Sequence, residues 1–262
     1  MVSVRASGLV ARGFVALVLL YLYAPVAVIV IFSFTTSPRL SMPIEGLTLA
    51  WYHNALANPL ITAALANSLI LAGVSAIVAG LLGAAFAFGV MKLAQHRLRR
   101  ALLGLSLLPA VVPLLVIGIS LAVVFHALGL AQGLRNAAIG HVLVSLPFVV
   151  LTMNARLETF DFATLEAARD LGASPFQTFR DITFPQIRSS VVGAALLAAA
   201  LSLDEFVVTW FNIGNGQSVP VLVWGLMRRG VDPSINALAA LLFALLVCLV
   251  FLSNLIGRKH ST

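Results

Sequence analysis

Long apolar runs are the feature of this sequence that most constrains its fold. Hydrophobic residues make up 61% of the 262 residues and charged residues only 10%, with a mean hydropathy of +1.06. Soluble domains are about 45–50% apolar and about 25% charged. A water-soluble core cannot bury this excess, so a lipid bilayer must solvate part of the chain. Backbone groups in lipid must be hydrogen-bonded within the protein, which only helices and closed barrels allow. The sequence lacks the alternation of apolar and polar residues typical of a barrel, so an all-α polytopic membrane protein is predicted.

The apolar runs predict a single transmembrane domain over residues 1–262 with a polar loop at about 154–190. A helix needs about 20 residues to cross a hydrocarbon core of about 30 Å. The predicted spans cover residues 13–34, 61–90, 101–130, 137–153, 191–211 and 235–256. The first is longer than the apolar part of a secretory signal, about 7–15 residues, so we expect it to be retained. The second and third spans are longer than a crossing requires, so we expect tilt, a kink at Pro109 and Pro113 in the third, or ends that project into water.

The positions of lysine and arginine predict the orientation of these six transmembrane helices. Of the 16 basic residues, 12 fall on the side of the N-terminus and 4 on the opposite side. This bias is typical of cytoplasmic loops, so both termini and the polar loop are predicted to be cytoplasmic. It also accounts for the net charge of +7 without nucleic acid. The single cysteine, Cys248, excludes an internal disulfide framework.

Small residues are concentrated in the second predicted span, which carries Gly73, Gly80, Gly83 and Gly89 among many alanines. Small residues allow helix backbones to approach closely in membranes. We therefore expect this span to form a helix–helix contact surface, although glycine and alanine also simply fill many membrane segments.

The polar loop is predicted to form two short helices. In the first, Leu165, Ala168 and Gly172 share one face, while Glu166 and Asp170 share another. Gly172 suits the left-handed position at a helix end. From residue 166 to residue 181 the loop carries three acids and two arginines. An interfacial anchor favours basic residues on its polar face, so a protein partner explains this loop better than anionic lipid does.

The second short helix is predicted to begin at Ser174–Pro175, with serine as the cap and proline in the first turn. Pro185 is predicted to end this helix and to lead toward the fifth span.

The spacing within this loop resembles the EAA loop of permease subunits of binding-protein-dependent ABC importers. The matching residues are Glu166, Ala167, Ala168, Gly172, Ile182 and Pro185, with Phe184 where the family usually has leucine. The resemblance implies a type I ABC importer permease fold, in which these residues form a coupling loop seated on an ATPase. It also implies a second homologous permease subunit, two ATPase subunits, an extracytoplasmic substrate-binding protein and a place in the bacterial cytoplasmic membrane.

An energy source is not expected within this chain. It contains no Gly-Lys pair, so the phosphate-binding pattern G-x-x-x-x-G-K-[ST] is missing. The resemblance implies that ATP-Mg binds to the partner ATPase and that this chain is not an enzyme. We predict neither catalytic residues nor a metal or cofactor site in it, because its five histidines are scattered and form no H-E-x-x-H motif.

Two adjacent acids, Asp204 and Glu205, lie in the fifth predicted span. A charged side chain at a helix centre costs about 2.5–3.5 kcal/mol, so such residues face a cavity or pair with a cation. Adjacent helical residues point about 100° apart, so we expect one acid to meet the pathway and the other a neighbouring helix. The pair favours a site for a cationic substrate or a structural network. Trp210 adds either a cation–π face or part of an interfacial aromatic belt.

The stretch "SLDEFVVTWF" with its downstream segment resembles the second permease of spermidine/putrescine importers. Permeases for ferric iron, thiamine, opines and amino-acid derivatives share parts of it, so a polyamine or another small solute is implied. A stand-alone secondary transporter that uses the two acids as a cation relay is the alternative class, but no internal inverted repeat is evident. The apolar piece 219–227 is too short to span and is expected to dip into the outer interface.

Overall fold

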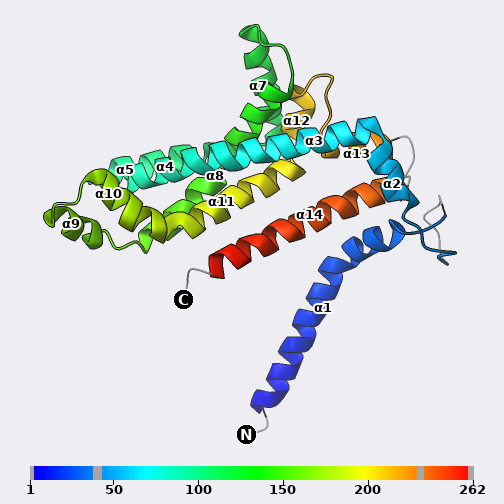
Figure 1. Cartoon of the computed structure of the whole chain (residues 1–262), viewed down its shortest axis with the longest axis horizontal. Coiled ribbons are helices and arrows are strands. Elements are labelled where there is room, and N and C mark those ends of the chain that lie inside the picture. The colour runs from blue at the N-terminus through cyan, green and yellow to red at the C-terminus, as the bar shows by residue number, and fades with distance from the viewer. Residues whose placement is uncertain (1–2, 38–42, 229–232, 259–262) are drawn as a thin grey trace. The chain divides into compact units, whose positions relative to one another are not determined.

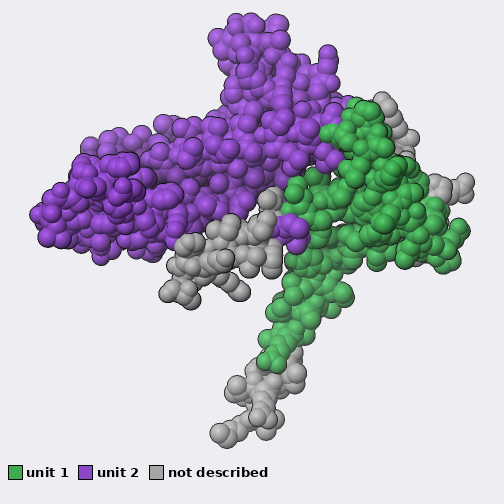
Figure 2. Space-filling model, in the orientation of Figure 1, with its two compact units in different colours: residues 1–62, 223–245 green, residues 63–222, 246–262 purple. Residues whose placement is uncertain are grey.

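The computed structural model describes residues 3–37, 43–228 and 233–258, and this part of the chain is almost entirely helical. Its one β-type pairing among those residues is an isolated bridge between Thr35 and Leu47. The chain divides into two compact units (Figure 2). One contains residues 1–62 and 223–245, and the other contains residues 63–222 and 246–262.

The first unit is built around helix α1 (Ser3–Phe32), which contains most of the first predicted span. Its apolar side chains from residue 11 onward are largely exposed, as expected for a helix solvated by lipid. After α1 the chain turns back toward α2 (Ala50–Ala57). The indole Nε1 of Trp51 donates to the carbonyl of Thr35 at 2.6 Å, and Tyr52 shares a hydrogen bond with Ser33 at 2.6 Å.

The second unit contains long helices that run side by side (Figure 1). The second predicted span is a continuous rod of α3 (Pro59–Val74), a π-helical turn η1 (Ser75–Ala79) and α4 (Gly80–Met91). The fourth predicted span lies within α8 (Leu134–Glu158). Helix α8 packs against α4, η1 and α11 (Phe184–Asp204), and α4 and α11 also contact each other. Helix α8 is therefore the central helix of this unit.

Two of the four glycines of the second predicted span lie at helix–helix contacts. A Cβ atom on Gly83 would lie 2.5 Å from Val149 of α8, and one on Gly80 would lie 3.1 Å from Ala195 of α11. Gly73 and Gly89 face open space within this chain. The close packing of α4 on α8 and α11 thus depends on the absence of side chains at two positions.

The third predicted span departs from a straight helix at its prolines, as expected, but it is divided into separate helices and not only kinked. It consists of α5 (His96–Ser106), α6 (Leu108–Val111) and α7 (Leu114–Ala127). Val112 is extended, with ψ 133°, as a residue before proline is expected to be. Pro113 then caps α7, which lies beside α12 (Val207–Asn212) (Figure 1).

The fifth predicted span is wrong as a continuous helix from 191 to 211. Helix α11 ends at Asp204, Glu205 is extended with ψ 105°, and α12 begins at Val207. The short apolar piece forms α13 (Val219–Met227), and the sixth predicted span lies within α14 (Pro233–Arg258).

Four helical stretches among the described residues are long and apolar enough to cross a membrane: 11–32, 59–91, 134–158 and 175–204. Two shorter apolar helices, at 114–127 and 233–248, correspond to parts of the third and sixth predicted spans. The count of six crossings and the side on which the termini lie stay predictions. Several residues used to predict orientation, Arg39, Arg229 and Lys259 among them, lie outside the described residues.

Candidate functional site

The polar loop folds as the predicted helical hairpin. Helix α9 (Ala163–Asp170) is followed by Gly172, whose φ of +86° is the left-handed conformation expected there. Helix α10 (Pro175–Thr178) begins with a full capping box. The Ser174 hydroxyl accepts from the Gln177 N–H at 3.3 Å, and the Ser174 N–H donates to the Gln177 side chain at 2.8 Å. We call residues 163–183 the loop hairpin.

Pro185 does not end the second helix of the loop hairpin, contrary to the sequence prediction. The helix continues from α10 through a π-helical turn, η2 (Phe179–Thr183), directly into α11. The N–H of Phe184 donates to the carbonyl of Phe179, five residues back. Pro185 falls in the first turn of α11, and the wider turn before it accommodates a residue that has no N–H to donate.

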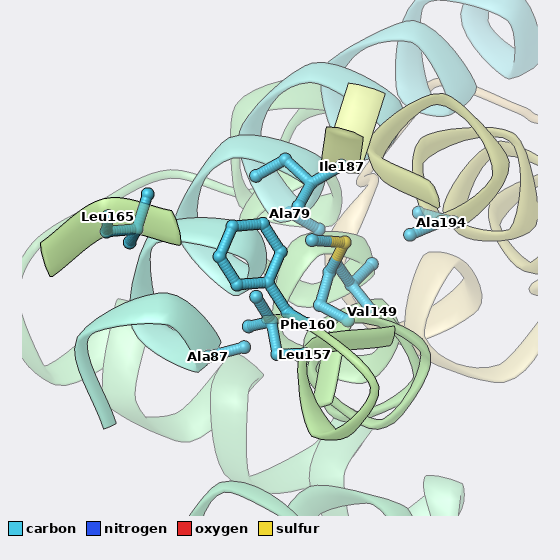
Figure 3. Packing of buried hydrophobic residues seen from close by; sticks show 10 residues of the cluster. Ala79, Ala87, Val149, Leu157, Phe160, Leu165, Ile187 and Ala194 are labelled. Atoms are coloured by element: carbon cyan, nitrogen blue, oxygen red, sulfur yellow. The ribbon is translucent and has the colours of Figure 1, made fainter. Parts of the chain in front are cut away.

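A buried apolar cluster attaches the loop hairpin to the long helices, and we call it the anchor cluster (Figure 3). Its buried members are Ala79, Ala87, Val149, Met153, Leu157, Phe160, Leu165, Ile187, Ala194 and Ala198. Leu165 of α9 is only 6% exposed and enters the cluster with Phe160, while Ile182 packs against its edge. The loop hairpin is therefore joined to α4, α8 and α11 through packed side chains.

The side of the loop hairpin that faces away from the anchor cluster is both acidic and apolar. Glu166, Ala167 and Gly172 are exposed, and Ala168 is half-buried. Two large apolar side chains beside them are also exposed: Leu171 by 89% and Phe176 by 69%. Exposed apolar groups of this size among charged residues are typical of an interaction surface.

The two acids of the fifth span line a cavity of about 300 Å³, which we call the break cavity. Its walls are formed by Pro109, Ala110, Val112, Leu114, Val144, Phe148, Leu201, Asp204, Glu205, Phe206 and Val207. Two helix interruptions meet here, one between α6 and α7 and one between α11 and α12, with α8 opposite them. Non-helical backbone at membrane depth is tolerated where it lines a cavity, and interrupted helices form the binding sites of many transporters.

The two acids differ in their surroundings within this cavity. Asp204 is exposed, whereas Glu205 is 7% exposed and its Oε1 accepts from the N–H of Val208 at 2.8 Å. Glu205 thereby caps the first turn of α12, while Asp204 has its carboxylate open to the cavity. Both acids line one cavity at the point where α11 ends. Trp210 is 47% exposed, packs on Phe206 with ring centroids 5.7 Å apart, and does not line the cavity.

Sequence reasoning missed His141, which lies beside this site. His141 of α8 is buried and bonds both sides of the helix interruption. Its Nδ1 is 2.6 Å from the hydroxyl of Ser202 in α11, and its Nε2 is 2.7 Å from the hydroxyl of Thr209 in α12. An ionisable side chain within an apolar span was the available signal.

A second polar side chain fixes the far end of α12. The amide of Asn212 donates to the carbonyl of Gly118 in α7 at 3.0 Å and to that of Val208 at 2.9 Å. The short helix α12 is thus held to α8 at its beginning and to α7 at its end. Across the described residues, no group of three or more histidine, cysteine, aspartate or glutamate side chains is arranged to hold a metal ion.

The chain belongs to the family described as binding-protein-dependent transport system inner membrane component, which matches residues 76–261. This family is a membrane-embedded transport component and not an enzyme. The fold described above is thus that of an ABC importer permease.

Two characterised relatives are close in sequence. The chain is 34% identical over 250 residues to the spermidine/putrescine transport system permease protein PotC of Escherichia coli (strain K12), covering 95% of this chain and 94% of that protein. It is also 34% identical over 229 residues to the putrescine transport system permease protein PotI of the same organism, covering 85% and 81%.

Solved structures show the same fold. A chain from a bacterial alginate ABC transporter in complex with alginate pentasaccharide-bound periplasmic protein aligns with a TM-score of 0.73 at 16% identity, over 97% of this chain and 95% of that one. A chain of the inward-facing MetNI methionine ABC transporter aligns with a TM-score of 0.61 at 17% identity, over 78% and 99%.

Proposed function

We propose that this chain forms part of the pathway of an ATP-driven importer for polyamines such as spermidine or putrescine. The observation that carries the proposal is the pair of acids at the break cavity, in a chain that matches a spermidine/putrescine permease over nearly its whole length. A polyamine is a flexible methylene chain with ammonium groups. The cavity offers an open carboxylate on Asp204 between apolar walls such as Phe148 and Leu201.

The charge chemistry of the cavity favours a cation of this kind. An unpaired carboxylate at membrane depth is costly, and an incoming ammonium group relieves that cost through a charge-assisted hydrogen bond. A volume of about 300 Å³ is at the lower limit for small-molecule pockets and fits a narrow solute. Glu205 already accepts from the Val208 N–H, so we assign the direct contact with the ammonium group to Asp204. Glu205 is assigned a role in the shape of the cavity.

The energy for import is proposed to come from a separate ATPase that docks on the loop hairpin. Three features support this partner: the EAA-type residues Glu166, Ala167, Ala168 and Gly172, the exposed Leu171 and Phe176, and the packing of Leu165 into the anchor cluster. A second permease, two ATPases, an extracytoplasmic binding protein and a place in the bacterial cytoplasmic membrane complete the proposed assembly.

Reconstitution of the complete complex in proteoliposomes tests this proposal. Asp204→Asn removes the charge and keeps the shape, and it should lower labelled spermidine or putrescine uptake by roughly 10–100-fold, the value of one charge-assisted hydrogen bond. ATP hydrolysis stimulated by the binding protein should continue. Glu158→Gln, an exposed acid at the end of α8, is the matched control and should transport normally. Equal loss of uptake and complex assembly in Asp204→Asn would show that the acid is structural.

The same vesicles separate the alternatives. Competition by thiamine, a ferric iron complex or an opine, with none by spermidine, would show the same fold serving another solute. Uptake driven by an ion gradient in vesicles that contain this chain alone would show a secondary transporter.

A further inference from the structure

We infer that His141 is a positioning residue for the import pathway, and that it holds the interruption between α11 and α12 in the shape that presents the two acids to the break cavity. The two hydrogen bonds of His141 go not to the acids but to residues on either side of them. Ser202 lies two residues before Asp204, and Thr209 lies four residues after Glu205. The transport test of this inference rests on the proposed function, whereas its thiol-labelling test depends on the geometry alone.

The hydrogen bonds around His141 run in one direction, which fixes the form of the imidazole. The Thr209 hydroxyl donates its single hydrogen to the carbonyl of Glu205 at 2.9 Å, so it must accept from His141 Nε2–H. A neutral imidazole with a proton on Nε2 has an acceptor at Nδ1, which takes the hydrogen of the Ser202 hydroxyl. The chain of bonds therefore runs from Ser202 through His141 and Thr209 to the carbonyl of Glu205, which lies at the interruption.

This chain of bonds compensates the backbone groups that the interruption exposes. Where α11 ends, the last carbonyls lose their helical partners, and a buried carbonyl without a partner is costly. The Glu205 carbonyl is satisfied by Thr209, and the Glu205 carboxylate satisfies the Val208 N–H. His141 ties both arrangements to α8, the central helix of this unit. Without the imidazole, the first turn of α12 loses this tie to α8, and the Glu205 carboxylate, which is bonded to the Val208 N–H, loses its fixed position at the cavity.

Helices α8 and α12 approach closely next to His141. A Cβ atom on Gly140, the residue before His141, would overlap the side chain of Val208 in α12. Helix α8 thus approaches α12 closely at this level, and His141 fits between two hydroxyl groups. Because hydrogen bonds are directional, this contact selects one orientation of α12, which apolar packing alone does not.

The transport test compares His141→Ala with Ser145→Ala in the complete reconstituted complex. Ser145 is a buried hydroxyl one turn along α8 that donates to the His141 carbonyl at 2.7 Å and takes no part in the bridge. We expect His141→Ala to lower labelled spermidine uptake about tenfold while ATP hydrolysis stays within about twofold, and Ser145→Ala to change neither by more than about twofold. A parallel loss of uptake and ATP hydrolysis, or an equal loss in Ser145→Ala, would overturn the inference.

Amide substitutions keep the test informative if His141→Ala fails to assemble. His141→Gln places an N–H near the position of Nε2 and keeps the link to Thr209, while His141→Asn places an oxygen near Nδ1 and keeps the link to Ser202. Both should transport at a level between wild type and alanine. Adding Thr209→Val should reduce uptake more in the His141→Gln background than in His141→Asn, because only the first background keeps the link to Thr209, and coupled residues are non-additive. Equal additive losses in both backgrounds would refute the bridge.

Thiol labelling tests the geometry without any transport. Cys248 is the only cysteine, so Cys248→Ser gives a background without thiols. Val207→Cys reports the cavity just after the interruption, and Leu201→Cys reports the same cavity before it. His141→Ala should accelerate labelling of Val207→Cys by a small cationic thiosulfonate about fivefold or more, and that of Leu201→Cys much less, because α11 remains packed on α8. Unchanged labelling at Val207→Cys would overturn the inference, even if polyamine uptake is absent and the proposed function is wrong.

Discussion

The anchor cluster and the break cavity lie along the same helix, α8, but they are held by different forces. The anchor cluster joins the loop hairpin to α4, α8 and α11 through apolar side chains, several of them alanines. Beside the break cavity, α8 packs on α11 and α12 and is also joined to them by buried hydrogen bonds among His141, Ser202 and Thr209. Leu157 and His141 are about 24 Å apart along α8 at 1.5 Å per residue.

This difference indicates a division of tasks. Apolar contacts have no preferred direction, so a packed cluster can transmit a push while its members shift slightly against one another. Hydrogen bonds in a dry environment are directional and costly to leave unmade. The helix ends at the break cavity are therefore expected to keep one geometry as long as these bonds are made, and to leave it only when they break. A central helix with one kind of contact at each end can connect a moving loop to a site with discrete states.

The largest expected effect comes from placing a charge in the anchor cluster. Leu165→Asp buries a carboxylate without a partner, so α9 should leave the cluster and ATP-driven uptake should fall to background. Leu165→Met keeps the volume and should retain most uptake, since such swaps cost less than about 1.5 kcal/mol. Ala163→Asp adds the same charge at an exposed position of α9 and is the control. Normal uptake by Leu165→Asp would show that the cluster does not attach the hairpin.

A smaller effect is expected where α4 meets α8. Gly83→Ala places a Cβ atom against Val149 and should lower the stability of the detergent-solubilised complex by about 1–3 kcal/mol. Gly89→Ala, six residues along the same helix and facing open space, should be neutral or stabilising by up to about 1 kcal/mol. Thermal unfolding of the two variants makes the comparison. If both shift equally, the contact is not specific to Gly83.

The smallest effect concerns charge at the base of the loop hairpin. Burial lowers the pKa of the Lys92 ammonium, and the positive charge of Arg169 in α9 lowers it further. A lowered pKa leaves more neutral amine at a given pH, and the neutral amine is the form that reacts with acylating reagents. Arg169→Gln should therefore raise the pKa of Lys92 and slow its acylation at pH 8–9, below the usual lysine pKa of about 10.4.

Lys259 is the only other lysine and serves as the internal reference in the same sample, quantified by peptide mass spectrometry. An unchanged ratio of Lys92 to Lys259 labelling in Arg169→Gln would show that α9 does not lie beside Lys92.

The sequence was sufficient to predict elements whose causes are local. Apolar length predicted α1, the rod of α3 and α4, α8 and α14. The left-handed Gly172 and the Ser174 cap predicted the loop hairpin, because a turn and a cap depend on their own residues. The contact role of Gly83 followed from small-residue composition, although composition did not separate it from Gly89, whose surroundings are set by tertiary structure.

The elements that were missed depend on partners distant in the sequence. Nothing in the letters around Asp204 and Glu205 ends a helix. The interruption is satisfied by Thr209, which donates to the Glu205 carbonyl, while His141 bonds the Thr209 hydroxyl. His141 lies 61 residues before Ser202, so its bridge was not visible in any local pattern. Pro185 was misread because a proline normally ends a helix, whereas here a wider turn precedes it and absorbs the missing N–H.

That wider turn, η2, has a consequence for how the two ends of one rod are aligned. Each α-helical residue advances about 100° around the axis. A π turn contains one residue more than an α-helical turn, so it shifts the angular positions of the residues on its two sides relative to each other. The side chains of α10 and those of α11 therefore follow separate angular registers. A chain shortened by one residue between 179 and 183 would keep α9, α10 and their caps, yet Phe176 would point about 100° away, toward a different neighbour.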